Sequence, residues 1–261
     1  MRISANLGFL YSDLPLPARI RAAARDGFDA VECHFPYDIP AAALRAALNE
    51  TGLEMLALNT APGDLAAGEF GLAALPGRRD DARAAVAQAV AYGAEIGAAH
   101  VHVMAGRSGG GDGAEAAFRE TLAHACDLAA AQGMGVLIEP INRRDVPGYH
   151  LHSVEQAAET VVALGRDNLR IIFDCYHAQI EGGDLIRRFE AHLPLIGHVQ
   201  IAAVPDRGEP DGGEICYERL LPAFRAAGYR SAVGAEYRPR GGDTRAGLGW
   251  LPRLRAALAA V

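Results

Sequence analysis

The chain has 261 residues, enough for one large domain that buries its core without disulfides or a structural metal. Half of the residues are hydrophobic and the formal net charge is −7. Because nucleic-acid-binding proteins usually carry a basic face, nucleic acid is not an expected partner. The four cysteines show neither CxxC nor paired spacing, and there is no apolar run of about 20 residues, so we expect reduced thiols, no membrane span and a cytoplasmic location.

Strand-like and helix-like segments alternate eight times along the chain. Most of the strand-like segments are short apolar runs with little alternation, which is typical of parallel strands buried on both faces. They cover residues 3–7, 30–34, 54–59, 100–104, 136–139, 170–174, 196–201 and 232–236. The pattern predicts an α/β fold of one domain, residues 1–261, as a single (β/α)₈ TIM barrel.

The helical segments carry recognisable start and stop signals. A helix over residues 41–50 should end at Gly52, and one over residues 215–227 should end at Gly228. Ser153 and Gln156 have the spacing of a capping box. Gly- and Pro-rich segments follow the third, fourth and seventh strands, and in a barrel such loops form the catalytic rim.

Four consecutive strands in the second half of the chain each end on an oxygen-donor side chain. These residues are Glu139 in VLIEP, Asp174 in LRIIFD, Gln200 in LIGHVQ and Glu236 in SAVGAE. Because the carboxyl ends of barrel strands meet at one face, the four side chains should converge there. An all-oxygen set is hard, which favours Mg²⁺ or Mn²⁺ over Zn²⁺. Taken singly, each Glu could instead pair with an Arg or face solvent, and Gln200 could be a core residue.

Four more residues are candidates for contacting a substrate. His177 follows Asp174 in DCYH and could donate a hydrogen bond, and Arg207 in VPDRGEP could bind a substrate carboxylate bidentately. Asp145 could bind a hydroxyl or shape its loop, while His102 could face the cavity or be a satisfied core residue. The sequence has no P-loop, GxGxxG fingerprint, GxSxG elbow or zinc-finger spacing.

Several motifs give the chain a family resemblance. EPINRRDVPGYHL, DCYH, GHVQIA, DRGEPDGGEI and AEY resemble the hydroxypyruvate isomerase family of the xylose-isomerase-like barrels, and the similarity extends to SANL and VECHFPYD. The resemblance implies Glu139, Asp174, Gln200 and Glu236 as ligands of one divalent cation, with the two glutamates as proton donor and acceptor. Related sugar epimerases usually have His where Gln200 stands. They also have a His and an Arg that match His177 and Arg207, and often a Glu where Asp145 stands.

The expected function is therefore a metal-dependent isomerisation of a small hydroxy-oxo acid. Hydroxypyruvate and 2-hydroxy-3-oxopropanoate would interconvert through an enediolate. A 2-oxo-tetronate isomerase and a ketose 3-epimerase are alternatives in the same class. A metal-dependent endonuclease on the same barrel is the alternative from another class, and a non-catalytic sugar-acid binder would not need two apposed glutamates. The sequence is equally compatible with a monomer and with a homo-oligomer.

Overall fold

Eight parallel strands close into a barrel in chain order, with β1 hydrogen-bonded to β8. The computed structural model describes residues 1–259. The predicted (β/α)₈ barrel is confirmed, and every predicted strand lies within two residues of an observed one. The strands are β1 (Ile3–Asn6), β2 (Ala30–Cys33), β3 (Glu54–Asn59), β4 (His100–His102), β5 (Gly135–Ile138), β6 (Leu169–Asp174), β7 (Ile196–Ile201) and β8 (Val233–Ala235).

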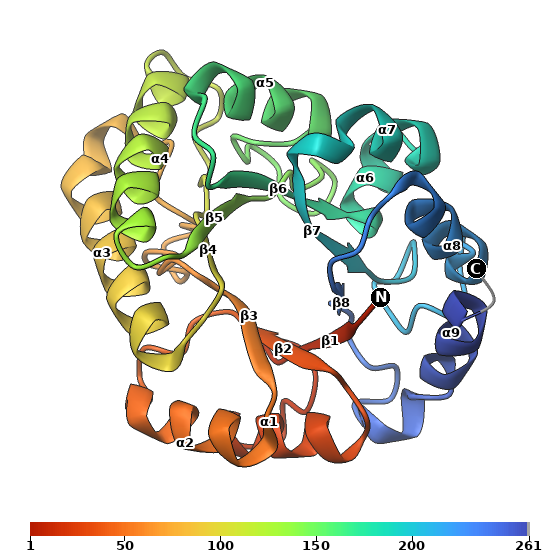
Figure 1. Ribbon diagram of the computed structural model, residues 1–261. Helices are drawn as coiled ribbons and strands as arrows, with labels where there is room; N and C mark the ends of the chain where they lie inside the picture. The colour runs from red at the N-terminus through yellow and green to blue at the C-terminus, as the bar shows by residue number, and fades with distance from the viewer. Residues whose placement is uncertain (260–261) are drawn as a thin grey trace.

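The helices form a ring around the barrel, as the view along its axis shows (Figure 1). In Figure 1 the red β1 lies beside the blue β8, so the first and last strands of the barrel are neighbours at the closure. The helices are α1 (Leu16–Arg25), α2 (Ala41–Thr51), α3 (Arg79–Ile96), α4 (Ala114–Ala130), α5 (Val154–Leu164), α6 (Cys175–Glu181), α7 (Leu185–His192), α8 (Tyr217–Ala227) and α9 (Trp250–Ala259). Short 3₁₀ turns occur at Pro76–Arg78, Leu193–Leu195 and Arg245–Gly247.

Burial of the strands on both faces explains their sequence pattern. Every residue of β1 and β2 is buried, because helices cover the outside of the barrel and side chains fill its inside. An aromatic cluster fixes β6 against the helices. Phe189 of α7 and Phe224 of α8 stack with their ring centroids 3.7 Å apart, and both pack edge-on against Phe173 of β6. This packing holds the strand that ends in Asp174.

The helix signals in the sequence are also confirmed. Gly52 and Gly228 end α2 and α8 with φ of 71° and 114°, a backbone conformation that suits glycine. The hydroxyl of Ser153 accepts the backbone N–H of Gln156 at 3.2 Å and caps α5. Gly52 and Gly228 thus end helices at the face opposite the rim, whereas the Ser153 cap fixes where the rim loop after β5 ends.

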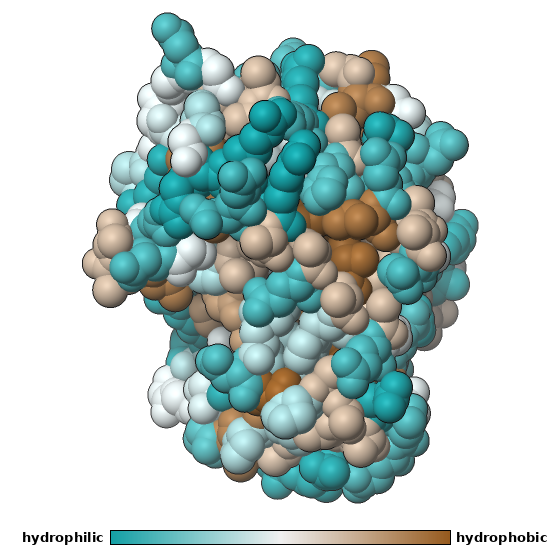
Figure 2. All heavy atoms as spheres, turned by 90° about the vertical axis from the view of Figure 1, so that its left-hand side faces the viewer, coloured by the Kyte–Doolittle hydropathy of each residue, from teal (hydrophilic) through white to brown (hydrophobic). Residues whose placement is uncertain are grey.

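The outer surface is mainly polar. Figure 2 shows the face carrying α3 and α4, where hydrophobic areas lie among larger hydrophilic ones. Within residues 1–259, the large hydrophobic side chains that are exposed are Leu65 in the loop after β3, Val162 on α5 and Ile186 on α7. No helix among the described residues combines the length and the apolar character needed to cross a bilayer.

Candidate active site

The four oxygen-donor residues predicted from the sequence lie together at the carboxyl ends of β5 to β8. Asp174 is the last residue of β6 and is paired in register with Gln200 of β7, which is in turn paired with Gly234 of β8. Glu139 and Glu236 directly follow β5 and β8. All four are at most 6% exposed. Carboxylates this deeply buried require positive or hydrogen-bonding partners.

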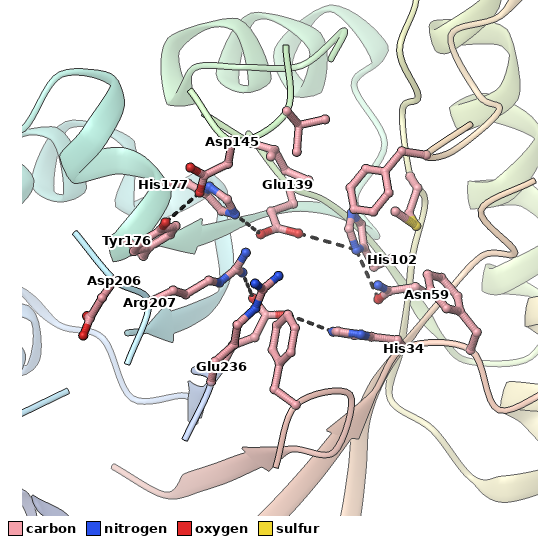
Figure 3. Close-up of a pocket in the computed structure, with 17 residues that line it drawn as sticks. His34, Asn59, His102, Glu139, Asp145, Tyr176, His177, Asp206, Arg207 and Glu236 are labelled. Carbon is pink, nitrogen blue, oxygen red and sulfur yellow. Dashed lines mark hydrogen bonds and ion pairs between the residues drawn. The ribbon is translucent and has the colours of Figure 1, made fainter. Parts of the chain in front are cut away.

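Arg207 supplies the positive charge. Its Nη2 lies 2.7 Å from Glu236 Oε2 and 3.4 Å from Asp174 Oδ2, and Figure 3 shows its side chain between Glu139 and Glu236. Burial by itself would lower the pKa of Arg207, but the surrounding carboxylates raise it above its usual value. The guanidinium therefore stays charged and neutralises the carboxylate cluster.

Glu236 is strongly held as a carboxylate. Its Oε1 accepts from Asn6 Nδ2 at 2.9 Å and lies 3.0 Å from His34 Nε2, while its Oε2 binds Arg207. Burial would raise the pKa of Glu236, but Arg207 and His34 outweigh burial and lower it to about 2. The end of β8 thus presents an ionised, well-oriented carboxylate.

Glu139 lies in a different environment. Burial and the nearby Glu236 and Asp174 raise its pKa well above the ordinary value. Its neighbours are two imidazoles, with His102 Nδ1 3.8 Å and His177 Nε2 3.6 Å from its carboxylate oxygens. Burial lowers the pKa of both histidines, that of His102 to about 4, so both are neutral at pH 7.

The hydrogen bonds of His177 determine which of its nitrogens carries the proton. The backbone N–H of Asn142 donates to Nδ1 at 3.3 Å, and the Asn142 side-chain nitrogen lies 2.6 Å from the same atom. Nδ1 is therefore an acceptor, and a neutral His177 carries its proton on Nε2. That proton points toward Glu139 and Asp174, which makes His177 a hydrogen-bond donor at the site.

Asp145 lies at the edge of the site. It accepts from Tyr176 Oη at 2.6 Å and from Asn142 Nδ2 at 3.2 Å. Burial would raise the pKa of Asp145, but the hydrogen bonds from Tyr176, Asn142 and Arg144 lower it. Asp145 therefore organises its loop and also lines the cavity.

The site opens into a cavity of about 510 Å³. Glu139, Glu236, His102, His177, Arg207 and Asp145 all line it. The rest of the wall has aromatic and apolar side chains, namely Phe9, Phe35, Phe70, Met104, Ile141, Val146 and Tyr176. It also has four polar ones, namely His34, Asn59, Asp206 and Arg238. Ten of the 17 lining residues are polar or charged, and a cavity in which such groups converge suits a small polar molecule.

Two buried oxygens test whether a cation fits this donor set. Glu139 Oε1 and Gln200 Oε1 have no hydrogen-bond partner among the described residues, although each is a strong acceptor. Potential ligand atoms of Glu139, Asp174 and His177 all lie within 4.8 Å of one another. Of these, the two carboxylates are available to a cation, because Nε2 of His177 carries a proton and its Nδ1 accepts from Asn142. The potential ligand atoms are mainly carboxylate oxygens, and two of the buried oxygens have no partner in the described part of the chain. The donor set is therefore compatible with a divalent cation that prefers oxygen.

Several residues of the site were not predicted from the sequence: His34, Asn59 and Arg238 line the cavity, and Asn6 donates to Glu236. His34 follows β2, while Asn6 and Asn59 end β1 and β3. Asn59 Oδ1 lies 3.2 Å from His102 Nδ1 and orients that ring. The rule that polar residues at strand ends meet at one face would have found all three, had it been applied to the first half of the barrel. Arg238 lies in the loop beyond β8 rather than at the strand end, so this rule would not have found it.

Comparison with known proteins places the chain in a family. The xylose isomerase-like TIM barrel model matches residues 20–254. The chain belongs to the xylose isomerase-like TIM barrel family. One member of that family, the 2-oxo-tetronate isomerase of Cupriavidus necator, is 49% identical over 253 residues, covering 96% of this chain and 97% of its own. The hydroxypyruvate isomerase of Escherichia coli is 38% identical, covering 98% of this chain and 100% of its own.

A solved structure of the same family is closely similar. The crystal structure described as AP endonuclease, family 2, from Brucella melitensis superposes with a TM-score of 0.93 at 40% identity and covers 97% of this chain and 98% of its own. Full-length similarity to isomerases identifies this xylose isomerase-like barrel as an isomerase. The expected enzyme class is thereby confirmed.

Proposed function

We propose that the protein isomerises a small hydroxy-oxo acid through an enediolate, with Glu139 and Glu236 as the acid/base pair. The observation that carries this proposal is the pair of buried glutamates facing one cavity, with Arg207 between them. Burying two carboxyl groups in one cavity costs folding free energy, which a catalytic role explains. The hydroxypyruvate to 2-hydroxy-3-oxopropanoate interconversion is the simplest reaction of this type.

Glu139, Asp174, Gln200 and Glu236 would hold one divalent cation, for which the oxygen donors favour Mg²⁺ or Mn²⁺. When bound, such a cation polarises a substrate carbonyl and acidifies the neighbouring C–H. Support comes from the unpartnered Glu139 Oε1 and Gln200 Oε1.

The chain's own residues would carry the protons. For hydroxypyruvate, one glutamate takes a proton from C3, and C2 receives a proton from that glutamate or from the other. The C3 hydroxyl loses its proton while the C2 oxygen gains one. His177 Nε2–H, held in its tautomer by Asn142, is placed to donate to a substrate oxygen. His102, oriented by Asn59, places a neutral imidazole beside Glu139.

Two arginines would recognise the substrate carboxylate. Arg207 and Arg238 both stack on Phe9, with guanidinium carbons 5.2 Å and 5.3 Å from the ring centroid. Arg207 Nη2 is already bound by Glu236 and Asp174. Arg238 is exposed and forms no ion pair within the described part of the chain. Arg207 Nε has no hydrogen-bond partner among the described residues, so both arginines keep donors for a substrate carboxylate, with Arg238 on the exposed side.

A 2-oxo-tetronate substrate is the second candidate within this class. The relative from Cupriavidus necator, at 49% identity, bears that name, and a four-carbon acid undergoes the same enediol chemistry. Asp145 at the cavity edge could then bind the additional hydroxyl. A ketose 3-epimerase is less well supported, because a neutral sugar makes no use of Arg238.

Exchange with D₂O tests the proposal. Purified protein is incubated with Mg²⁺ or Mn²⁺ and with hydroxypyruvate, 2-oxo-tetronate or a neutral ketose, and products are followed by NMR with an EDTA control. We expect metal-dependent product with solvent deuterium at the protonated carbon for at least one acid. Turnover of the ketose alone would make the protein an epimerase. Absence of exchange with all three substrates would refute the proposal.

An endonuclease is the candidate from another class, because the Brucella melitensis structure is described by that activity. The net charge of −7 and a single potential metal cluster within residues 1–259 count against it. Metal analysis and nicking of a duplex with one abasic site separate the two. Two or three Zn²⁺ per chain with nicking would favour the nuclease.

A further inference from the structure

A buried polar cluster lies within the barrel and includes Gln200. Glu32 of β2 is 2% exposed, and its carboxylate accepts from Gln200 Nε2 at 3.1 Å and lies 2.6 Å from His198 Nε2. Asn6 Nδ2 lies 3.3 Å from Glu32 Oε1 and also donates to Glu236. The side chain of Glu32 therefore crosses the barrel interior, because β1 and β8 separate β2 from β7 in the barrel order.

The sequence of β8 makes room for this crossing. Gly234 lies opposite Gln200 in the register, and a Cβ added to it would lie 2.3 Å from Glu32 Oε1 and 2.9 Å from His198 Nε2. Any other residue at position 234 would push the carboxylate out of place. The glycine in SAVGAE is thus required by the approach of Glu32, a feature that the sequence alone does not reveal.

The contact with Glu32 determines which end of the Gln200 amide faces the site. An amide has a donor end and an acceptor end of nearly equal shape, whereas a carboxylate only accepts. Glu32 therefore accepts from Nε2, so Oε1 is the end of the Gln200 amide that faces the site. This oxygen has no partner among the described residues, although Gln200 is only 5% exposed. Turning the amide over would place two acceptors against each other and leave the NH₂ group unpaired.

We propose that Glu32 is a positioning residue that fixes the amide oxygen of Gln200 toward the divalent cation. The inference rests on the cation site of the proposed function. Carboxylate ligands need no such device, since their two oxygens are equivalent, but a Gln ligand offers its oxygen in only one of two orientations. Through Asn6 the same carboxylate also helps to fix Glu236.

Mn²⁺ binding to the purified protein, measured by calorimetry and electron paramagnetic resonance without substrate, tests the proposal. Glu32→Gln keeps the shape but can donate as well as accept, so it no longer selects one orientation of the Gln200 amide. We expect Mn²⁺ affinity to fall by about 10- to 100-fold, the usual cost of losing a partner that orients a ligand. Gly234→Ala displaces Glu32 without changing its charge and should weaken Mn²⁺ binding in the same direction.

A second background distinguishes positioning from general support of the fold. In Gln200→Glu the ligand is a symmetric carboxylate beside Glu32, so adding Glu32→Gln should leave Mn²⁺ affinity unchanged or raise it. Thr121→Val is the control, because it removes another buried hydrogen bond, from Thr121 to Ala73 O, away from the site. This control should lower stability without changing Mn²⁺ affinity.

The possible failures are distinguishable. If Glu32→Gln and Gly234→Ala both fold and bind Mn²⁺ like the wild type while Gln200→Ala binds it weakly, the positioning role is wrong and the cation site stands. An equal loss from Glu32→Gln in both backgrounds would also overturn the positioning role. If the wild-type protein does not bind Mn²⁺, the cation site itself, and with it the proposed mechanism, is wrong.

Discussion

At the residue scale, the two glutamates of the site differ in their partners although both are buried. Glu236 has three positive or donating neighbours, whereas Glu139 lies between two neutral imidazoles. Such divergent environments are typical of paired acid/base carboxylates. Glu139 and Glu236 thus have different surroundings although both line one cavity.

Glu139→Gln and Glu236→Gln should each lower kcat by at least about 10²-fold, because each removes one proton-transfer group. Circular dichroism should show an intact fold, since Gln preserves the shape. Steady-state kinetics on the preferred acid measures the effect. Full activity in either variant would remove that residue from the acid/base pair.

Arg238→Met should raise KM for the acidic substrate by roughly 10- to 100-fold, the effect of losing a hydrogen bond to a charged group, with little change in kcat. Arg187→Met is the matched control, because Arg187 is an exposed residue of α7 that does not line the cavity. Arg207→Lys should lower kcat as well as raise KM, since Arg207 also binds Glu236. An unchanged KM in Arg238→Met would place carboxylate recognition elsewhere.

At the scale of elements, the sequence predicts the strands well because their signal is local. Short apolar runs bounded by Gly and Pro mark β1 to β8, and the polar residues at their ends predict which side chains meet. The contacts of Arg207 could not be predicted in this way. They depend on a positive φ of 55° at that residue and on the path of the loop after β7, neither of which has a sequence period.

The crossing of Glu32 to Gln200 lay equally beyond sequence reasoning. It joins strands that are neither adjacent in the chain nor adjacent in the barrel. Periodicity reports which face of a strand a residue occupies, but not which residue it meets across the interior. The sequence therefore predicts that four oxygen-donor side chains meet at the strand ends, but it does not predict the residues that orient them.

The loop after β7 offers a test at this scale. Gly213 has a φ of 78°, and a Cβ there would lie 2.0 Å from Val204 O, whereas a Cβ at Gly212 would meet nothing closer than 3.7 Å. Gly213→Ala should therefore shift the loop that carries Arg207, lowering Tm and reducing kcat/KM by about tenfold or more. Gly212→Ala should change neither by much, and equal effects of the two variants would contradict this account.

At the scale of the whole molecule, the buried carboxylates couple metal binding to stability. A cation that neutralises them binds only the folded chain. At 100 times its Kd, Mn²⁺ should therefore add about 2.7 kcal/mol to the free energy of unfolding and raise Tm by about 5–10 °C. Thermal melts with Mn²⁺ and with EDTA measure this shift. No shift in the wild type, or the same shift in Glu139→Gln, would argue against the site.

The pairing of β1 with β8 has a consequence for how the enzyme is made. Asn6, near the start of the chain, donates to Glu236, which is among its last residues. A ribosome must therefore release residues 6–236 before Glu236 has all of its partners. Proteolytic fragments that lack either terminal strand should be inactive. Such a loss should abolish turnover even where most of the helical content is retained. A circular permutant opened between other strands would keep this contact.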